Sequence, residues 1–350
     1  MTMIERADEV AVLDRPDIPG LRFRRPVLPA DWAPLAEIET EAHVADGVKE
    51  SATPATFAHS WSNLPGVDVE RDMIVAEVDG KPVAHAVGRT TVRDGVAVGE
   101  LSGTVLPEFR RRGIGTALHR TAREQVLAKL EAEGHPGPRE LRVFGMDSEA
   151  GAVALFEREG FVRIRHGFEM RRDLGAPIPE VVLPPGIDIR PVTEAQHRAI
   201  HAADDEAFRD HWGHRESTES DFRALFEHPE TDTSLWRVGW AGDEVAGVVM
   251  NMIFRPDNER FGFKRGWLDR VSVRRPWRGI GLGRALVTAS LHALRDAGMD
   301  EAWLGVDGAN ATGALRLYEV TGFEVANGWS AWSRPVDGPA PEGWSGVEAP

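Results

Sequence analysis

A short glycine-rich pattern occurs twice in this chain, and each copy follows an apolar run and precedes a long helical stretch. The first copy reads Arg110-x-x-Gly113-x-Gly115, and the second reads Arg278-x-x-Gly281-x-Gly283. Other landmarks repeat in the same order: residues 20–27 with 186–192, and 155–161 with 317–323. A period of about 165 residues is far too long for a solenoid repeat. The chain is therefore predicted to be the duplication of a whole domain.

The second copy predicts a backbone cradle for an anion. Its three glycines let the chain turn sharply and bring several N–H groups close to a ligand, and a helix that starts there adds the positive end of its dipole. A dinucleotide fingerprint is excluded because Arg284 and Leu286 stand where its third glycine belongs, and no Gly-Lys-Ser/Thr sequence is present. A tight strand-to-helix turn without a ligand is the alternative. The predicted binding residues are Arg278, Gly279, Ile280, Gly281, Leu282, Gly283 and Arg284.

Together with Val271 and Val273, which alternate on the preceding strand, this pattern resembles motif A of the GCN5-related N-acetyltransferase (GNAT) superfamily, Arg/Gln-x-x-Gly-x-Gly/Ala. The resemblance implies an α/β fold with a mixed sheet. It also implies acetyl-CoA as co-substrate, with its pyrophosphate held by backbone amides. The first copy implies a comparable contact at Arg110, Gly113 and Gly115. The chain would then hold two tandem acyl-CoA N-acyltransferase domains, of which the C-terminal one is the more complete.

Proline and glycine divide the chain into parts. A proline-rich segment separates the two halves, and its composition is typical of a semi-rigid linker. We predict a flexible N-terminus over residues 1–19, an N-terminal domain over 20–174, a linker over 175–185, a C-terminal domain over 186–336 and a flexible tail over 337–350. The GNAT resemblance implies the same order in each domain: a strand, two helices, three strands, a helix, a strand, a helix and two strands.

Composition narrows the partners. A formal net charge of −15 argues against non-specific binding to nucleic acid, and it permits a cationic amine substrate. The chain has no cysteine, so a cysteinyl intermediate is impossible and direct attack by the acceptor on acetyl-CoA is expected. No run approaches the roughly 18 apolar residues that cross a bilayer, and residues 1–19 lack an apolar signal core. We expect a cytoplasmic monomer or homodimer with no metal, nucleic acid or membrane partner.

Tyr318, the only tyrosine, is the predicted proton donor to the departing thiolate. GNAT members commonly place a tyrosine in the closing helix, and Leu317-Tyr318-Glu319 is similar to that site. A phenol titrates near 10 and a thiol near 8.5, so a positioned phenol can donate as the thiolate forms. The first half has Phe156 at this place, which has no proton to give. The alternative is that Tyr318 is only a core residue.

Three further roles follow from the resemblance. Asp269, on the strand before the cradle, is similar to the acidic residue that acts as a base in family members, and alternation predicts its side chain on one face with Val271 and Val273. A backbone N–H near those valines would polarise the thioester carbonyl. Asn310 is similar to an asparagine that contacts the pantetheine arm, or it is an ordinary helix cap. An ion pair with a neighbouring arginine is the alternative for Asp269, and Glu100 is its counterpart in the first half.

Acceptor contacts are expected from the helical segment after the first strand of the second half. It contains Asp210, His211 and Trp212, of which Asp210 could hold a cationic amine and Trp212 could wall the pocket. The alternative is that these side chains pack and cap the helices. Nine of the eleven tryptophans follow residue 200, which weakly favours an active second half.

These patterns together predict an acetyl-CoA-dependent N-acetyltransferase that transfers acetyl to a primary amine of a small molecule. The architecture, Leu304-Gly-Val-Asp and the segment from Ala314 to Glu319 are also similar to mycothiol synthases, which acetylate a cysteinyl amine. A non-catalytic acyl-CoA sensor or interaction module is the alternative from another class, although a sensor has no need of a proton donor. A transferase that uses aminoacyl-tRNA is a third reading, made less attractive by the acidity of the chain.

Overall fold

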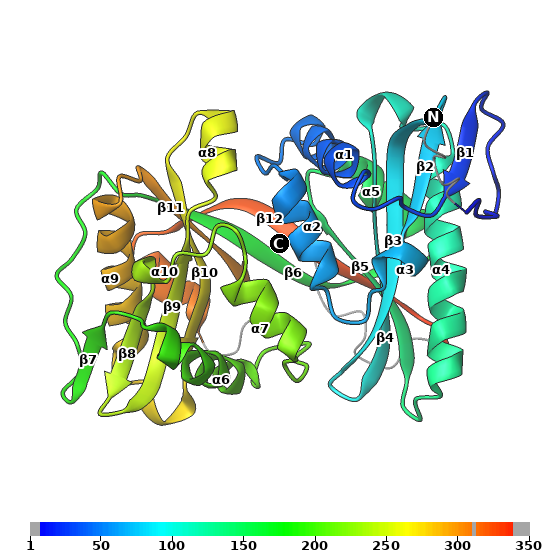
Figure 1. Ribbon diagram of the computed structural model, residues 1–350. Coiled ribbons are helices and arrows are strands. Elements are labelled where there is room, and N and C mark those ends of the chain that lie inside the picture. Colours follow the sequence, from blue (N-terminus) through cyan, green and yellow to red (C-terminus); the bar gives the residue numbers. More distant parts are fainter. Residues whose placement is uncertain (1–7, 310–312, 339–350) are drawn as a thin grey trace. The chain divides into compact units, whose positions relative to one another are not determined.

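The computed structural model describes residues 8–309 and 313–338 and divides them into two compact units (Figure 1). Unit 1 holds residues 8–164 and 330–338, and unit 2 holds residues 165–309 and 313–329. This division differs from the predicted boundary at residues 175–185. The segment from Arg165 belongs to the second unit because it pairs with a strand there, from Glu301↔Asp173 to Asp307↔Gly167. The segment from Ser330 belongs to the first unit, where the Ser333 hydroxyl donates to the Leu141 carbonyl over 3.1 Å.

Unit 1 has a mixed sheet with helices on both faces. Helices α4 and α5 cover a core that includes Leu118, Val126 and Phe156, and helices α1 to α3 cover a second core around Leu35, Ile38 and Met73. The strand order is β1-β2-β3-β4-β5-β12. The strands are β1 (Leu21–Arg24), β2 (Ile74–Val78), β3 (Lys81–Arg93), β4 (Val96–Val105), β5 (Arg139–Met146) and, from Ser330, β12 (Glu324–Pro335). The α-helices are α1 (Trp32–Ala45), α2 (Pro54–Ser62), α3 (Val69–Asp72), α4 (Ile114–Glu133) and α5 (Ala150–Arg158).

Unit 2 repeats this arrangement. Helices α9 and α10 cover a core that includes Leu286, Leu291 and Leu304, and α6 and α7 cover the opposite face around Ile200 and Trp236. The strand order is β6-β11-β10-β9-β8-β7. The strands are β6 (Val162–Asp173) from Arg165, β7 (Ile187–Arg190), β8 (Arg237–Ala241), β9 (Glu244–Met252), β10 (Arg265–Val273) and β11 (Glu301–Asp307). The α-helices are α6 (His197–Phe208), α7 (Glu219–Phe226), α8 (Arg255–Phe261), α9 (Leu282–Asp296) and α10 (Ala314–Val320).

The expected mixed α/β fold is confirmed, with two differences in detail. The pair of strands predicted at the end of each half is a single long strand, β6 or β12. Helix α8 was not predicted; it starts with Pro256 in its first turn and ends at Gly262, which has a φ of 69°. Proline early and glycine after the end are the ordinary signals of such a helix, but its seven residues are too few to show helical periodicity.

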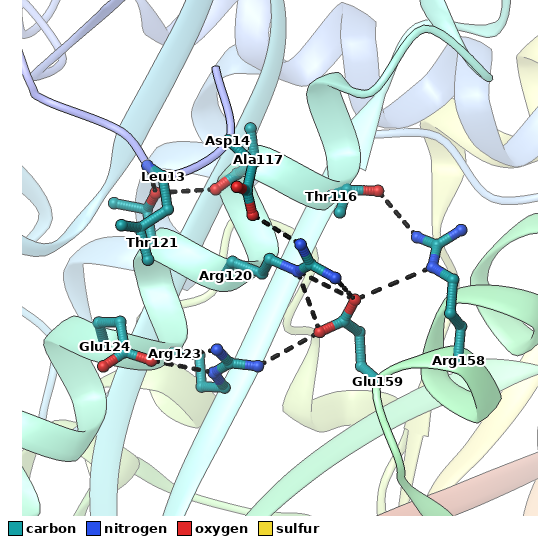
Figure 2. A network of polar contacts seen from close by, with 10 residues as sticks. All are labelled: Leu13, Asp14, Thr116, Ala117, Arg120, Thr121, Arg123, Glu124, Arg158 and Glu159. Carbon is teal, nitrogen blue, oxygen red and sulfur yellow. Dashed lines mark hydrogen bonds and ion pairs between the residues drawn. The ribbon is translucent and has the colours of Figure 1, made fainter. Parts of the chain in front are cut away.

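Residues 8–19, predicted to belong to a flexible N-terminus, pack against unit 1. Val10, Val12 and Ile18 contact the core under α4. The Leu13 N–H donates to the Thr121 hydroxyl over 3.0 Å, and Asp14 pairs with Arg120 at 2.6 Å (Figure 2). The acidic composition concealed the three apolar residues that hold this segment in place.

Two strands of each sheet diverge beside the glycine turn. Strands β10 and β11 pair in parallel only from Arg265↔Glu301 to Trp267↔Trp303, although β10 continues to Val273 and β11 to Asp307. In unit 1, β4 and β5 pair only from Ala97↔Arg139 to Glu100↔Arg142. Beyond the point where two neighbouring strands stop pairing, the backbone groups that face the gap have no partner strand. A ligand can then enter the sheet between the two strands.

Candidate active site

The second glycine turn is open to a ligand. Gly281 is the N-cap of the 15-residue helix α9, with φ 89° and ψ 1°, and Gly279 has a φ of 76°. A Cβ built at either position would meet nothing within 4 Å. The first amides of an α-helix have no intrahelical acceptor, and they carry the positive end of the dipole. The turn therefore presents unpaired N–H groups and bare backbone to an anion.

A cavity of about 380 Å³ extends from this turn between the diverging strands. Its walls come from the end of α6, the second part of β10, the end of β11 and the first turns of α9 and α10. It includes most of the predicted second-half site: Asp269, Val271, Val273, Arg278, Gly279, Gly281, Leu282, Gly283, Arg284, His211 and Tyr318. Ile280, in the turn, is half exposed but is not part of this wall. Asn310 lies outside the described residues.

Arg278 organises the turn rather than presenting a free charge. Its guanidinium donates to the carbonyls of Val273, over 2.8 Å, and Ala207, over 2.9 Å, and to the Asp210 carboxylate over 2.6 Å. Arg275 also binds Asp210, with an Nε to Oδ2 distance of 2.9 Å. Asp210 is thus held by two arginines and is not part of the cavity wall. We therefore replace its predicted contact with an amine by a structural role, joining α6 to the glycine turn.

A β-bulge delivers Asp269 to the cavity. The pairing of β10 with β9 runs Leu268↔Asn251 and then Arg270↔Met250, so Asp269 is an extra residue without a partner. The bulge changes the phase of the strand: Leu268 contacts the core beneath α9, whereas Arg270 reaches Asp204 on α6 at 2.6 Å. Strict alternation is therefore broken at Asp269. The alternation that predicted its side chain on one face with Val271 and Val273 is thus interrupted, although all three residues line the cavity.

The surroundings of Asp269 shift its pKa in both directions, with a net increase. By its accessible surface Asp269 is exposed to solvent, at the point where it lines the cavity. Burial raises the pKa of the Asp269 carboxyl, Arg270 lowers it and Asp204 raises it again. His211 lies in the same wall, and burial, aided by the charge of Arg278, lowers its pKa below the usual value. The cavity thus holds a carboxyl group with a raised pKa and an imidazole with a lowered pKa, and both are candidates for a general base.

Tyr318 is both a core residue and a cavity residue. It is only 5% exposed, and its ring packs edge-on against Phe323 with 6.0 Å between the centroids. Burial raises the pKa of its phenol above the ordinary value. The phenol is therefore protonated at neutral pH, as a proton donor must be, and the packing fixes its direction.

Several cavity residues escaped the sequence reading, and Asp307 is the most informative. It lies at the end of β11, where a parallel strand delivers side chains to a ligand site, and that position was a usable signal. Trp212 is half-buried and is not part of the described wall, although Arg165 lies over its ring. The other missed residues are Ala207, Phe208, Leu268, Ser272, Trp277, Gly305, Val306, Gly313, Ala314 and Leu317.

The first glycine turn has the same backbone shape in a different setting. Gly113 is the N-cap of α4 with φ 90° and ψ −13°, and Arg110 donates to the Val105 and Ala42 carbonyls and to Asp46. A Cβ at Gly113 would lie 3.3 Å from Pro16, and one at Gly115 would lie 3.4 Å from Val105. The N-terminal segment thus lies against this turn, whereas Gly279 and Gly281 face open space.

No three His, Asp or Glu side chains of the described residues are grouped as metal ligands, and no helix in that part of the chain is long and apolar enough to cross a membrane.

Comparison with known proteins gives consistent matches. Residues 197–323 match the acetyltransferase (GNAT) family, and residues 70–163 match an acetyltransferase (GNAT) domain. The chain is 30% identical over 299 residues to the mycothiol acetyltransferase of Geodermatophilus obscurus, covering 84% of this chain and 91% of that one. It is 35% identical over 302 residues to the mycothiol acetyltransferase of Salinispora arenicola, covering 81% and 91%.

Solved structures agree on the fold. A GCN5-related N-acetyltransferase from Sphaerobacter thermophilus is similar with a TM-score of 0.67 and 25% identity, over 90% of this chain and 95% of that one. A tandem GNAT protein from the clavulanic acid biosynthesis pathway is similar with a TM-score of 0.64 and 19% identity, over 91% and 99%. The second likeness concerns the fold alone.

Proposed function

The chain belongs to the GNAT acetyltransferases, as a tandem member similar to the mycothiol acetyltransferases, and we propose that the cavity of unit 2 is where it transfers acetyl to an amine. As a member of this family it is an acetyl-CoA-dependent N-acetyltransferase. The observation that carries the proposal is the single cavity that joins the open glycine turn to Asp269 and Tyr318. The sensor alternative is not favoured, because a binding module needs neither group.

Four parts of the cavity have distinct tasks in this proposal. The amides at the start of α9 and bare Gly279 and Gly281 hold the pyrophosphate of acetyl-CoA, which supplies the activated acetyl group. An N–H of β10 near Val271 to Val273, left without a β11 partner by the divergence, polarises the thioester carbonyl. Asp269 accepts the proton of the acceptor ammonium, directly or through water. Tyr318 donates its phenolic proton to the thiolate as it leaves, and the proton that the acylated nitrogen releases restores the phenol, directly or through water.

The names of the relatives support a proposal for the acceptor class. The most similar proteins reported above are named mycothiol acetyltransferases, and we propose a comparable acceptor, the cysteinyl amine of a small thiol, as the first substrate to test. The first unit keeps the turn but has Phe156 where the second has Tyr318, so we assign it a structural or regulatory part. Cytoplasmic location, a monomeric or homodimeric state and the absence of a metal stay predictions.

The test is CoA release from acetyl-CoA against a panel of amines, comparing wild type with Tyr318→Phe. Because the chain has no cysteine, a thiol reagent detects CoA with no background from the protein. Cysteinyl acceptors carry their own thiol, so for them the acetylated product is detected by mass spectrometry instead. We expect acceptor-dependent release that falls about 10²-fold or more in Tyr318→Phe. The matched variant Phe156→Tyr, which adds the hydroxyl to the first unit, should leave the rate unchanged. Equal rates for Tyr318→Phe and wild type would remove Tyr318 from the mechanism.

A further inference from the structure

Arg165 joins two walls of the unit 2 cavity. From β6, its guanidinium donates to Asp307 Oδ2 through Nε over 2.9 Å and through Nη2 over 2.6 Å. The same guanidinium lies 5.3 Å from the centre of the Trp212 ring. Asp307 ends β11, and Trp212 follows α6 next to His211, so one side chain connects the strand wall and the loop wall.

The Asp307 carboxylate is fixed in direction. Arg165 binds one oxygen, and the Ala309 N–H donates to the other over 3.0 Å. The side chains of Arg165 and Asp307 are only 20% and 19% exposed. A partly buried, hydrogen-bonded pair is screened less by water than a surface pair, so its geometry is better defined.

The cavity has opposite charges at different parts of its wall. The glycine turn and the start of α9 provide positive charge for phosphates, whereas Asp269 and Asp307 lie on the diverging strands. Asp210, the carboxylate expected to receive an amine, is held by Arg275 and Arg278. Asp307 is the acidic wall residue that remains beside the proposed base, and a carboxylate held by one arginine still has lone pairs for an ammonium N–H.

We propose that Asp307 binds the ammonium group of the acceptor and that Arg165 is the positioning residue that holds Asp307 and the His211–Trp212 loop in place for it. This inference rests on the proposed function of the unit 2 cavity. It assigns a positioning role to a residue that precedes the linker in sequence, so residues 186–350 alone would lack the side chain that holds Asp307 in place.

A simpler reading is that Arg165 only fastens β6 to β11. The chain offers a matched control on the same two strands, because Arg171 of β6 pairs with Glu301 of β11 at 2.7 Å. The Arg171–Glu301 pair lies at the other end of the β6–β11 pairing, where Glu301 is opposite Asp173, whereas Asp307 is opposite Gly167. Neither Arg171 nor Glu301 lines the cavity. A fastening role predicts similar effects for both arginines, and a positioning role predicts an effect for Arg165 alone.

The experiment compares Arg165→Met, Arg165→Lys and Arg171→Met in the full chain. We expect Arg165→Met to raise the KM for the best amine of the panel about tenfold while the KM for acetyl-CoA changes less than about twofold. Arg165→Lys should recover part of the loss, because it keeps the charge but not the forked geometry. Arg171→Met should change neither constant. An unchanged amine KM in Arg165→Met, or an equal rise in Arg171→Met, overturns the proposal.

A second measurement separates this inference from the proposed function. Amide hydrogen exchange over residues 209–213, which needs no acceptor, should be faster in Arg165→Met and unchanged in Arg171→Met. If the wild type acetylates no amine of the panel, the proposed function fails while the exchange still decides whether Arg165 positions the loop. Unchanged exchange in Arg165→Met overturns the positioning role even where the enzyme is active.

Discussion

The two glycine turns have the same backbone geometry but different neighbouring residues. In each, the motif arginine is bound by an aspartate that lies just after the end of the first α-helix of its unit, Asp46 for Arg110 and Asp210 for Arg278. In each, the N-cap glycine has a φ near 90°. The clamp and the turn therefore belong to the fold, and they do not distinguish an active unit from an inactive one.

What differs is the strand beside the turn. In unit 1 the pairing of β3 with β4 runs without interruption from Ala84↔Val105 to Arg93↔Val96, so no residue corresponds to the bulged Asp269. Glu100, expected as its counterpart, is bound by Arg89 at 2.7 Å and by Arg93 at 2.8 Å. Burial would raise the pKa of Glu100, but these arginines hold it below its usual value. The bulge of one residue in β10, absent from β4, thus distinguishes the candidate base Asp269 from the structural carboxylate Glu100.

The two glycine turns also differ in backbone strain and in the space that is open to a ligand. Arg111 adopts a φ of 62° where the second turn has Gly279, and a left-handed residue other than glycine costs roughly 1–2 kcal/mol. Pro16 lies against Gly113, whereas nothing lies against Gly281. The second turn keeps the glycines and the open approach that a ligand requires, which the first has partly lost.

The largest effect should come from the bulge. Asp269→Asn is expected to lower kcat about 10²-fold to 10⁴-fold, because the amide cannot accept the ammonium proton. Since burial raises the pKa of Asp269, the wild-type rate should fall as pH drops toward that raised value, and this acid limb should be lost in the variant. The pH–rate profile of both proteins measures it.

The paired variant for Asp269→Asn is Glu100→Gln in unit 1. Breaking its contacts with two arginines should lower the free energy of unfolding and leave kcat within about twofold. A loss of turnover in Glu100→Gln equal to that in Asp269→Asn would mean that the first unit shares the chemistry.

A smaller effect is expected at the helix clamps. Asp210→Asn should weaken acetyl-CoA binding roughly tenfold, because Arg278 and Arg275 lose a charged partner and the turn is less firmly held. Asp46→Asn disturbs the matching clamp of unit 1 and should leave the acetyl-CoA KM unchanged. Steady-state kinetics at a fixed amine concentration compare the two, and equal increases would contradict the assignment of the site to unit 2.

The smallest effect concerns the acid stability of unit 1, through the Glu39 carboxylate of α1. Glu39 lies 3.2 Å from His85 Nε2 and accepts from the Thr104 hydroxyl over 2.8 Å. Burial alone would raise the pKa of Glu39, but the hydrogen bond and charge of His85, the charge of His43 and the Thr104 hydroxyl lower it to about 2.

Because the folded pKa of Glu39 is depressed, its stabilisation is present above the ordinary pKa of 4.5 and is lost as pH falls toward about 2. Between those values the wild type should lose about 2 to 3 kcal/mol more than Glu39→Gln. Urea unfolding at several pH values checks this. Parallel pH dependences in the two proteins would show that the carboxylate is not paired in this way.

The sequence predicted features that depend on local, repeated motifs. It did not predict features that depend on which strands or side chains pair across the fold. The duplication, the turns and Tyr318 could be found because glycine spacing and a lone tyrosine are visible in one dimension. The Asp269 bulge could not, since the phase of a strand depends on its neighbour. The amine contact predicted for Asp210 came from a carboxylate near an indole, whereas its arginine partners come from 65 and 68 residues away and were not visible in the local sequence. Residues 165–173 were placed in the first half because chain order does not show which sheet a strand joins.

The most direct test of the unit 2 site is amide hydrogen exchange with and without acetyl-CoA, on the wild-type chain and with no acceptor. The account predicts that acetyl-CoA slows exchange over residues 268–273 and 279–284, which line the cavity and the glycine turn. It also predicts slower exchange over residues 314–318, the start of α10. Unchanged exchange in these segments, with protection confined to residues 110–116, would contradict it and move the acetyl-CoA site to unit 1.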